Sequence, residues 1–184
     1  ELAEEKSMIC ERLGVQPGEF GVMTAHRAEN VDDPDRFEQL LAGVERVAVA
    51  HKLDIIYPIH PRARERLSEF ELSVPDSIRI IDPLEYLDFL KLQANAALIL
   101  TDSGGIQEEA SILGIPCVTL RDNTERPETL DVGANELAGV DPDAILTSAD
   151  RMLATEHEWT TPYGDGHTAD RILDILCADT DVDT

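Results

Sequence analysis

Short apolar runs alternate with amphipathic segments along most of the chain. The run from Ala96 to Leu100 is typical of a strand covered on both faces, and the residues after Asp33 and Pro34 repeat apolar positions at helical spacing. Strands are predicted at 20–24, 54–58, 78–81, 97–101, 116–120 and near 136–140, and helices at 1–13, 34–51, 61–72, 85–93, 105–113, 127–132, 142–154 and 169–177. This alternation predicts an α/β fold with a doubly wound parallel sheet.

Residues 1–178 are predicted to form a single domain, followed by an acidic tail at 179–184. The first predicted helix lacks an N-cap residue, ends at Gly14 and begins at Glu1 rather than at methionine. These features favour a chain that starts inside a larger protein.

Two local expectations concern loops and helix faces. The strand at 20–24 is expected to lead into a polar loop, and Tyr86, Phe89 and Leu90 are expected to share one face of their helix. Ligands of doubly wound sheets bind at the carboxyl ends of the strands, so the loops that follow strands are where chemistry is expected.

The chain is strongly acidic. Its 184 residues carry 38 Asp and Glu against 15 Lys and Arg, so the formal net charge is −23. Such a surface repels polyanions, which disfavours generic DNA or RNA binding. Only three of the cations are lysines and twelve are arginines. This profile is typical of a salt-adapted (halophilic) protein, because carboxylates hold water and concentrated counterions screen their repulsion.

Salt adaptation predicts that the protein unfolds partially in dilute buffer. Circular dichroism across a salt series measures this, and a signal that stays flat would contradict salt adaptation.

The cysteines and the hydropathy pattern indicate the cellular compartment of the protein. Cys10, Cys117 and Cys177 show no short-range pairing, so neither a disulfide framework nor a metal site is indicated. No apolar run approaches the roughly 20 residues that cross a bilayer. No basic segment followed by an apolar stretch marks a signal peptide. The sequence therefore predicts a cytoplasmic protein that has no membrane partner.

The segment after the strand at 97–101 carries the strongest chemical signal. Gly104 and Gly105 lack the Cβ atoms that would block a phosphate, the free N–H groups of the helix start point at an anion, and Ser103 adds a hydroxyl donor. Glu109 lies four residues beyond Gly105 on the same helix face, where its carboxylate could accept hydrogen bonds from a ribose. The alternative is that the glycine pair only makes a tight turn.

Two further loops follow predicted strands. In the first, His26 could donate to a phosphate or shuttle a proton, and Arg27 could hold an anion by two parallel hydrogen bonds. In the second, Arg121 and Arg126 could offset the negative field of the molecule around an anionic ligand. The alternatives are a structural loop histidine and a solvated loop with internal Arg–Glu pairs.

Five motifs, in order along the chain, resemble the non-hydrolysing UDP-N-acetylglucosamine 2-epimerases. They are Thr-Ala-His-Arg-Ala-Glu-Asn (24–30), Asp-Pro-Leu-Glu-Tyr-Leu-Asp-Phe (82–89), Leu-Thr-Asp-Ser-Gly-Gly-Ile-Gln-Glu-Glu-Ala (100–110), Thr-Glu-Arg-Pro-Glu (124–128) and Pro-Tyr-Gly-Asp-Gly (162–166). The resemblance covers nearly the whole chain. It implies the C-terminal, Rossmann-like half of a two-domain enzyme of the glycosyltransferase-B type, the half that holds UDP.

The resemblance also implies roles for single residues. His26 would be the catalytic residue, facing the diphosphate, and Arg27 matches a position near which some family members bind a second, activating substrate molecule. The implied substrate ligands are Leu84 (through its backbone) and Phe89 at the uracil, Glu109 at the ribose, Ser103, Gly104 and Gly105 at the pyrophosphate, and Arg126 on the sugar side. The chain departs from the family pattern at 61–64 and at Thr168, away from the nucleotide loops.

The reaction implied by the resemblance inverts C2 of the sugar in UDP-N-acetylglucosamine. The C2 proton is removed, UDP leaves to give a 2-acetamidoglucal, and both return with C2 inverted, so no nicotinamide or other cofactor is needed. The family's acid and base carboxylates belong to the other half. This half alone is therefore expected to bind UDP weakly and to be inactive, and the full-length protein is expected to be a homodimer.

Other functions share parts of the pattern. A hydrolysing 2-epimerase that releases N-acetylmannosamine and UDP would use the same loops. A glycosyltransferase would share Glu109 and the nucleotide cleft, although the Thr-Glu-Arg-Pro-Glu segment and the His-Arg pair argue against it. A non-catalytic nucleotide-sugar-binding module is the alternative from a different functional class.

Overall fold

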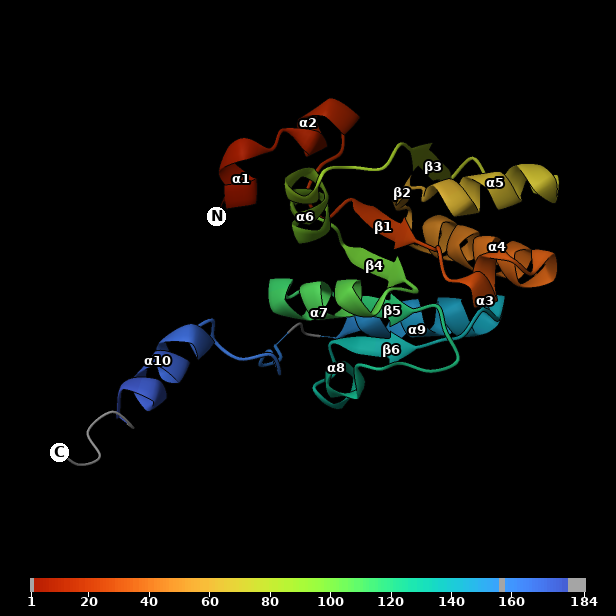
Figure 1. The fold of residues 1–184 in the computed structure, drawn as a ribbon. Helices are drawn as coiled ribbons and strands as arrows, with labels where there is room; N and C mark the ends of the chain where they lie inside the picture. Colours follow the sequence, from red (N-terminus) through yellow and green to blue (C-terminus); the bar gives the residue numbers. More distant parts are fainter. Residues whose placement is uncertain (1, 156–157, 179–184) are drawn as a thin grey trace.

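The computed structural model describes residues 2–155 and 158–178. Its centre is a parallel six-stranded sheet in the order β3-β2-β1-β4-β5-β6 (Figure 1). The chain builds outward from β1 to β3, returns to the centre at β4 and builds outward again to β6, which confirms the predicted doubly wound sheet. The strands are β1 (Phe20–Thr24), β2 (Asp54–Pro58), β3 (Ile78–Ile81), β4 (Leu98–Thr101), β5 (Cys117–Thr119) and β6 (Asn135–Leu137).

Helices cover both faces of the sheet. The covering helices are α2 (Ile9–Leu13), α4 (Pro34–His51), α5 (Pro61–Glu69), α6 (Tyr86–Ala94), α7 (Gly104–Leu113) and α9 (Pro142–Ala154). Residues of α4, α5 and α9 share one apolar core with one face of the sheet, and residues of α2, α6 and α7 share a second core with the other face. Ile55 and Ile56 of β2 belong to opposite cores, as alternating strand side chains require.

The longest helices begin where side chains cap them. Asp33 accepts the N–H groups of Asp35 and Arg36 at 3.0 and 3.1 Å, and Pro34 occupies the first turn of α4. Asp141 caps α9 in the same way. These capping residues explain why the predicted starts of both helices agree with the structure.

The single helix predicted at 1–13 is wrong. Two short helices, α1 (Leu2–Lys6) and α2, replace it. Ser7 interrupts the helix because its hydroxyl donates to Asp88 at 2.5 Å and accepts the N–H of Ile9 at 3.3 Å. Both short helices pack against α6.

Several other boundaries differ from the predictions. The loop after β1 contains a helical turn, α3 (Ala28–Val31), whose Val31 is fully buried. Helix α5 ends at Glu69, before the predicted 72, and Glu71 has a positive φ of 54°. Strand β6 ends at Leu137, before the predicted 140, because Gly139 turns the chain with a φ of 68°.

The residues expected to share one face of α6 differ in their exposure to solvent. Tyr86 is 63% exposed, whereas Leu92 and Gln93 are fully buried. Phe89 packs against the core of α2, α6 and α7, whereas Tyr86 faces solvent.

The described chain ends in α10 (Thr168–Ala178), which extends away from the body of the molecule (Figure 1). Its apolar residues Ile172, Leu173 and Leu176 are each more than half exposed. The predicted acidic tail at 179–184 lies outside the described residues. In the described part of the chain, we find no helix with the length and apolar character needed to span a bilayer.

Candidate functional site

The candidate site lies where β1 and β4 end side by side. These central strands carry their helical connections in opposite directions along the sheet, which opens a crevice at their carboxyl ends. The hydroxyls of Thr24 and Thr101 lie 2.6 Å apart across the two strand ends. Thr101 also accepts the N–H of Ser103 at 3.0 Å, so the chain leaves β4 in a fixed direction.

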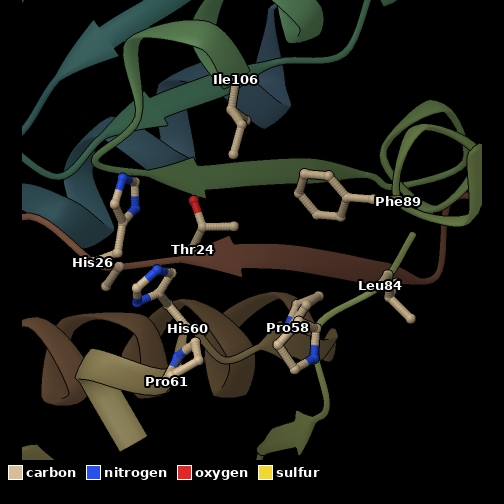
Figure 2. A pocket seen from close by; sticks show the side chains of 10 residues that line it. Thr24, His26, Pro58, His60, Pro61, Leu84, Phe89 and Ile106 are labelled. Atoms are coloured by element: carbon tan, nitrogen blue, oxygen red, sulfur yellow. The ribbon is translucent and has the colours of Figure 1, made fainter. Parts of the chain in front are cut away.

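An apolar cavity of about 230 Å³ occupies this crevice. His26, His60, Leu84, Phe89 and Ile106 contribute to its lining, and Phe89 and Ile106 reach it from α6 and α7 (Figure 2). The cavity is smaller than the roughly 300–1,000 Å³ pockets that hold drug-sized molecules. Its size therefore suits one ring of a ligand whose remainder lies outside it.

The start of α7 borders the cavity through Ile106. Ser103 is the N-cap residue of this helix, but its side chain makes no capping hydrogen bond to the helix N–H groups. Those N–H groups and the positive end of the helix dipole are therefore open to an anion.

Gly104 and Gly105 differ from every other glycine of the chain. Seven of the others have a positive φ, and a Cβ added to Gly21 or Gly43 would lie less than 3.0 Å from a neighbouring isoleucine. At Gly104 and Gly105 neither reason applies, because φ is not positive and an added Cβ would meet nothing closer than 3.8 Å. The tight-turn alternative therefore does not explain this glycine pair.

Arg126 lies beside the start of α7. A Cβ added at Gly104 would be 3.9 Å from the Cζ atom of Arg126. The Nε group of Arg126 donates to Glu108, which raises the pKa of the guanidinium. About a third of the Arg126 side chain is exposed, so it faces both the helix start and solvent.

Arg121, by contrast, makes all of its side-chain hydrogen bonds to other residues of the protein. It is buried and donates to Glu29, Asn123 and Glu125 at 2.7–3.1 Å. The hydrogen bonds from Arg121 lower the pKa of Glu125 to about 2. The expectation that Arg121 supplies free positive charge is therefore wrong, and the Arg–Glu alternative holds for this residue.

Glu109 is held in place by a residue that the sequence did not single out. The side-chain amide of Gln93, which is fully buried in α6, donates to the Glu109 carboxylate at 2.7 Å. This contact joins α6 to α7 and leaves part of the carboxylate accessible, since Glu109 is only half-buried.

Asp102 organises the loop after β1. It is fully buried, and its Oδ2 atom accepts the backbone N–H groups of His26 and Arg27 at 2.9 and 2.8 Å. The hydroxyl of Tyr57 supports the same loop by donating to the carbonyl of Ala25 at 2.9 Å. Burial, and to a lesser extent the charge of Asp102, raises the pKa of Tyr57.

The model of one protein family, UDP-N-acetylglucosamine 2-epimerase, matches residues 1–177. This chain belongs to that family. A UDP-N-acetylglucosamine 2-epimerase of Methanococcus maripaludis is 44% identical over 181 residues, which cover 95% of this chain and 50% of that protein. A second, from Methanocaldococcus jannaschii, is 46% identical over 162 residues, 86% of this chain and 44% of that protein.

A crystal structure of the M. jannaschii UDP-GlcNAc 2-epimerase, in complex with UDP-GlcNAc and UDP, matches this fold with a TM-score of 0.85 and 42% identity. The match covers 96% of this chain and 50% of that one. The chain thus spans about half the length of the curated 2-epimerases that it matches.

Most of the site residues predicted for this 2-epimerase family member are neighbours in the structure. His26, Leu84 and Phe89 line the cavity. Ser103, Gly104, Gly105 and Arg126 gather at the start of α7, and Glu109 follows one turn later. Arg27 lies close enough to Glu125 for its charge to help lower the pKa of that carboxyl.

Sequence reasoning missed the residues that support this site. Asp102, Gln93, His60 and Ile106 carry no role in the motif interpretation, although Asp102 and Ile106 lie within the motif at 100–110. A fully buried strand, β4, followed at once by an acidic residue is the signal that marks Asp102. Within the described residues, no cluster of His, Cys, Asp and Glu side chains has the arrangement of a metal site.

Proposed function

We propose that this chain is the C-terminal, UDP-binding half of a UDP-N-acetylglucosamine 2-epimerase, an isomerase that interconverts UDP-N-acetylglucosamine and UDP-N-acetylmannosamine. Membership of the family supports the proposal, as does a match to half of a relative whose structure contains UDP-GlcNAc and UDP. The observation that carries it is the pair Gly104 and Gly105, which neither backbone conformation nor packing requires.

The cavity suits the uracil ring. Phe89 offers an aromatic face, Ile106 closes the α7 side, and Leu84 borders the space from the loop after β3 (Figure 2). The peptide groups at Leu84 supply the donor and acceptor that a uracil edge requires. Burial of one flat ring against apolar side chains gives affinity, and the backbone contacts give specificity.

The diphosphate then lies at the start of α7. Without Cβ atoms at Gly104 and Gly105, phosphate oxygens reach the helix N–H groups directly. The uncommitted hydroxyl of Ser103 adds a donor, and Arg126 adds charge by exchanging Glu108 for a phosphate.

The ribose lies between these two contacts. Glu109 follows Gly105 by one helical turn, and its carboxylate, oriented by Gln93, accepts hydrogen bonds from the two ribose hydroxyls. Base, ribose and diphosphate are thus distributed over α6 and α7 in the order in which UDP connects them.

The chemical contribution of this half is departure of UDP from C1 of the sugar. Negative charge grows on the leaving diphosphate, and the N–H groups of α7, Arg126 and His26 stabilise that charge. The groups that remove and return the C2 proton belong to the other half of the enzyme. This half alone therefore binds UDP and catalyses no epimerisation, and no cofactor enters the reaction. The full-length enzyme is proposed to be a homodimer.

Titration of UDP into this chain in molar salt, followed by calorimetry, tests the binding site. Gly104→Ala should weaken binding about tenfold or more with no loss of fold, because alanine is compatible with the helix and its Cβ would be 3.8 Å or more from every neighbour, an ordinary van der Waals distance. Ser103→Ala and Glu109→Ala should weaken binding as well. Ser68→Ala and Glu45→Ala, at exposed positions on α5 and α4, are matched controls and should bind as the wild type does.

Two outcomes would contradict the proposal. A wild-type chain that is folded but does not bind UDP is not a UDP-binding half. A Gly104→Ala variant with unchanged affinity would show that phosphate does not approach the α7 backbone.

The full-length protein tests the reaction. UDP-N-acetylmannosamine should form from UDP-N-acetylglucosamine with uptake of deuterium at C2 from heavy water. His26→Ala should lower kcat by orders of magnitude if His26 assists UDP departure. Release of free N-acetylmannosamine and UDP would instead identify a hydrolysing enzyme, and absence of exchange at C2 would contradict an epimerase.

A further inference from the structure

Asp102 is a buried anion whose two oxygens face different partners. Oδ2 accepts the backbone N–H groups of His26 and Arg27 and lies 3.4 Å from the amide nitrogen of Asn30. These three donors satisfy one oxygen of a carboxylate that is fully buried. They fix the backbone of the loop, but they leave the other carboxylate oxygen, Oδ1, without a hydrogen-bond donor among the described residues.

The second oxygen, Oδ1, lies 3.0 Å from Nδ1 of His26. This contact is not aligned as a hydrogen bond, and Oδ1 has no other partner among the residues that the structure describes. A buried carboxylate oxygen without a donor is costly, because it has lost its hydrogen bonds to water and gained none from the protein. A proton on Nδ1, with a small rotation of the ring, removes that cost.

We propose that Asp102 is the positioning residue of His26, keeping the proton of the neutral imidazole on Nδ1 and leaving Nε2 as the nitrogen that meets the ligand. Asp102 is 0% exposed and the His26 side chain is 38% exposed, so the ring connects the protein interior to the cavity. A proton that His26 gains is then at Nε2, on the side of the ring away from Asp102.

His60 provides an internal comparison. Its ring lies beside that of His26, with centroids 5.8 Å apart (Figure 2). The N–H of Arg62 donates to Nδ1 of His60 at 3.2 Å, so the neutral His60 ring carries its proton on Nε2. Two adjacent histidines of the same cavity therefore carry opposite tautomers.

Substitution of Asp102 by asparagine reverses the tautomer at His26 alone. Asparagine has a single carbonyl oxygen, and the two backbone N–H groups of the loop hold it. Its NH₂ group then faces Nδ1 of His26, which must become an acceptor, and the ring proton moves to Nε2. His60 is unaffected, because its Nδ1 contact is made by a different backbone group.

NMR of this chain with ¹⁵N-labelled histidine, in molar salt at about pH 8, above the pKa of about 6.5 of a free histidine side chain, reads the tautomers directly. His26→Gln and His60→Gln assign the signals. The expected result is a proton on Nδ1 of His26 and on Nε2 of His60 in the wild type. In Asp102→Asn, only His26 should change. A wild-type His26 with its proton on Nε2, or a folded Asp102→Asn chain with no change, would overturn the proposal.

If Asp102→Asn does not fold, the wild-type spectrum still decides. The catalytic consequence rests on the proposed function, which the UDP titration tests separately. Tautomers as expected in a chain that does not bind UDP would refute the function and keep the positioning role. A chain that binds UDP but carries the His26 proton on Nε2 would keep the proposed function and refute the positioning role of Asp102.

Kinetics of the full-length enzyme separate positioning from a merely structural role. Asp102→Asn should lower kcat by more than about tenfold with KM nearly unchanged, because UDP contacts on α7 remain in place. In a His26→Ala background the same substitution should have no further effect on kcat, since Asp102 acts through His26. Equal losses in both backgrounds would overturn the positioning role.

Discussion

Two loops at the same edge of the sheet are held in opposite ways. The loop after β1, residues 25–30, is fixed from the interior by Asp102, which accepts backbone N–H groups. The segment after β5, residues 121–126, is held by Arg121, which is buried itself but whose carboxylate partners Glu29 and Glu125 are about half exposed.

This difference determines how each loop responds to a ligand and to solvent. Buried hydrogen bonds to a carboxylate are hardly screened by salt, and they set the backbone of the loop. Ion pairs whose carboxylates are half exposed contribute less and are screened by salt. His26 therefore has a fixed position, whereas Arg126 can exchange its carboxylate partner for an anionic ligand.

The largest expected effect comes from removing the interior anchor. Asp102→Ala leaves the N–H groups of His26 and Arg27 without an acceptor and should lower the free energy of unfolding by at least about 3 kcal/mol. Urea unfolding in molar salt measures this. Asp76→Ala, at an exposed aspartate before β3, is the control and should have almost no effect. Equal stability of the two variants would show that the loop is not held from within.

Arg121→Ala should have an intermediate effect, about 1–2 kcal/mol, because its loss removes charged hydrogen bonds but leaves partners that water can reach. The same urea experiment measures it. The loss should shrink as salt rises, unlike that of Asp102→Ala. If both losses depended equally on salt, the contrast between the loops would be wrong.

Arg126 should matter for ligand affinity rather than stability. Arg126→Ala should leave the urea midpoint unchanged and weaken UDP binding several-fold. Glu108→Gln should strengthen UDP binding, because it frees Arg126 from its carboxylate partner. Calorimetry compares the UDP affinity of both variants with that of the wild type. The change in affinity should have opposite signs in the two variants, and changes of the same sign would contradict the prediction.

The smallest expected effect is on how the stability of the protein depends on pH in the acid range. The contact with Arg121 lowers the pKa of Glu125 from 4.5 to about 2, so this pair stabilises the fold above about pH 4.5 and stops doing so as the pH falls through about 2. The urea midpoint of Glu125→Gln should therefore fall less steeply than that of the wild type between these two pH values. Asp32, with a pKa of about 2 set by Arg62 and Arg66, contributes equally to both proteins and cancels. Glu45→Gln is the control.

Much of the site was predictable because its residues follow strands. Apolar runs located β1 and β4, and the topology of a doubly wound sheet brings their ends together, so His26 and Ser103 were expected at one crevice. The glycine pair was recognisable in the sequence, but its meaning was not. Only the added-Cβ distances and the ordinary φ values show that neither turn nor packing requires Gly104 and Gly105.

The supporting residues were not predictable because their partners are distant in the chain. Asp102 lies 76 residues from His26, and Gln93 acts on a carboxylate of another helix. The break between α1 and α2 has the same origin, since Ser7 bonds to Asp88, 81 residues away. A pattern of polar and apolar positions records local preferences, and these contacts are not local.

By itself the sequence determined the order of the six strands and of most helices, the acidic surface and the family, since these follow from hydrophobic spacing, composition and contiguous motifs. The tertiary structure decided which charges an anionic ligand can reach. The sequence alone does not distinguish Arg121 from Arg126. In the folded chain Arg121 is buried and paired with Glu29 and Glu125, whereas Arg126 lies at the start of α7. The reason is that the partner of a charge depends on distance and dielectric, which exist only in the folded chain.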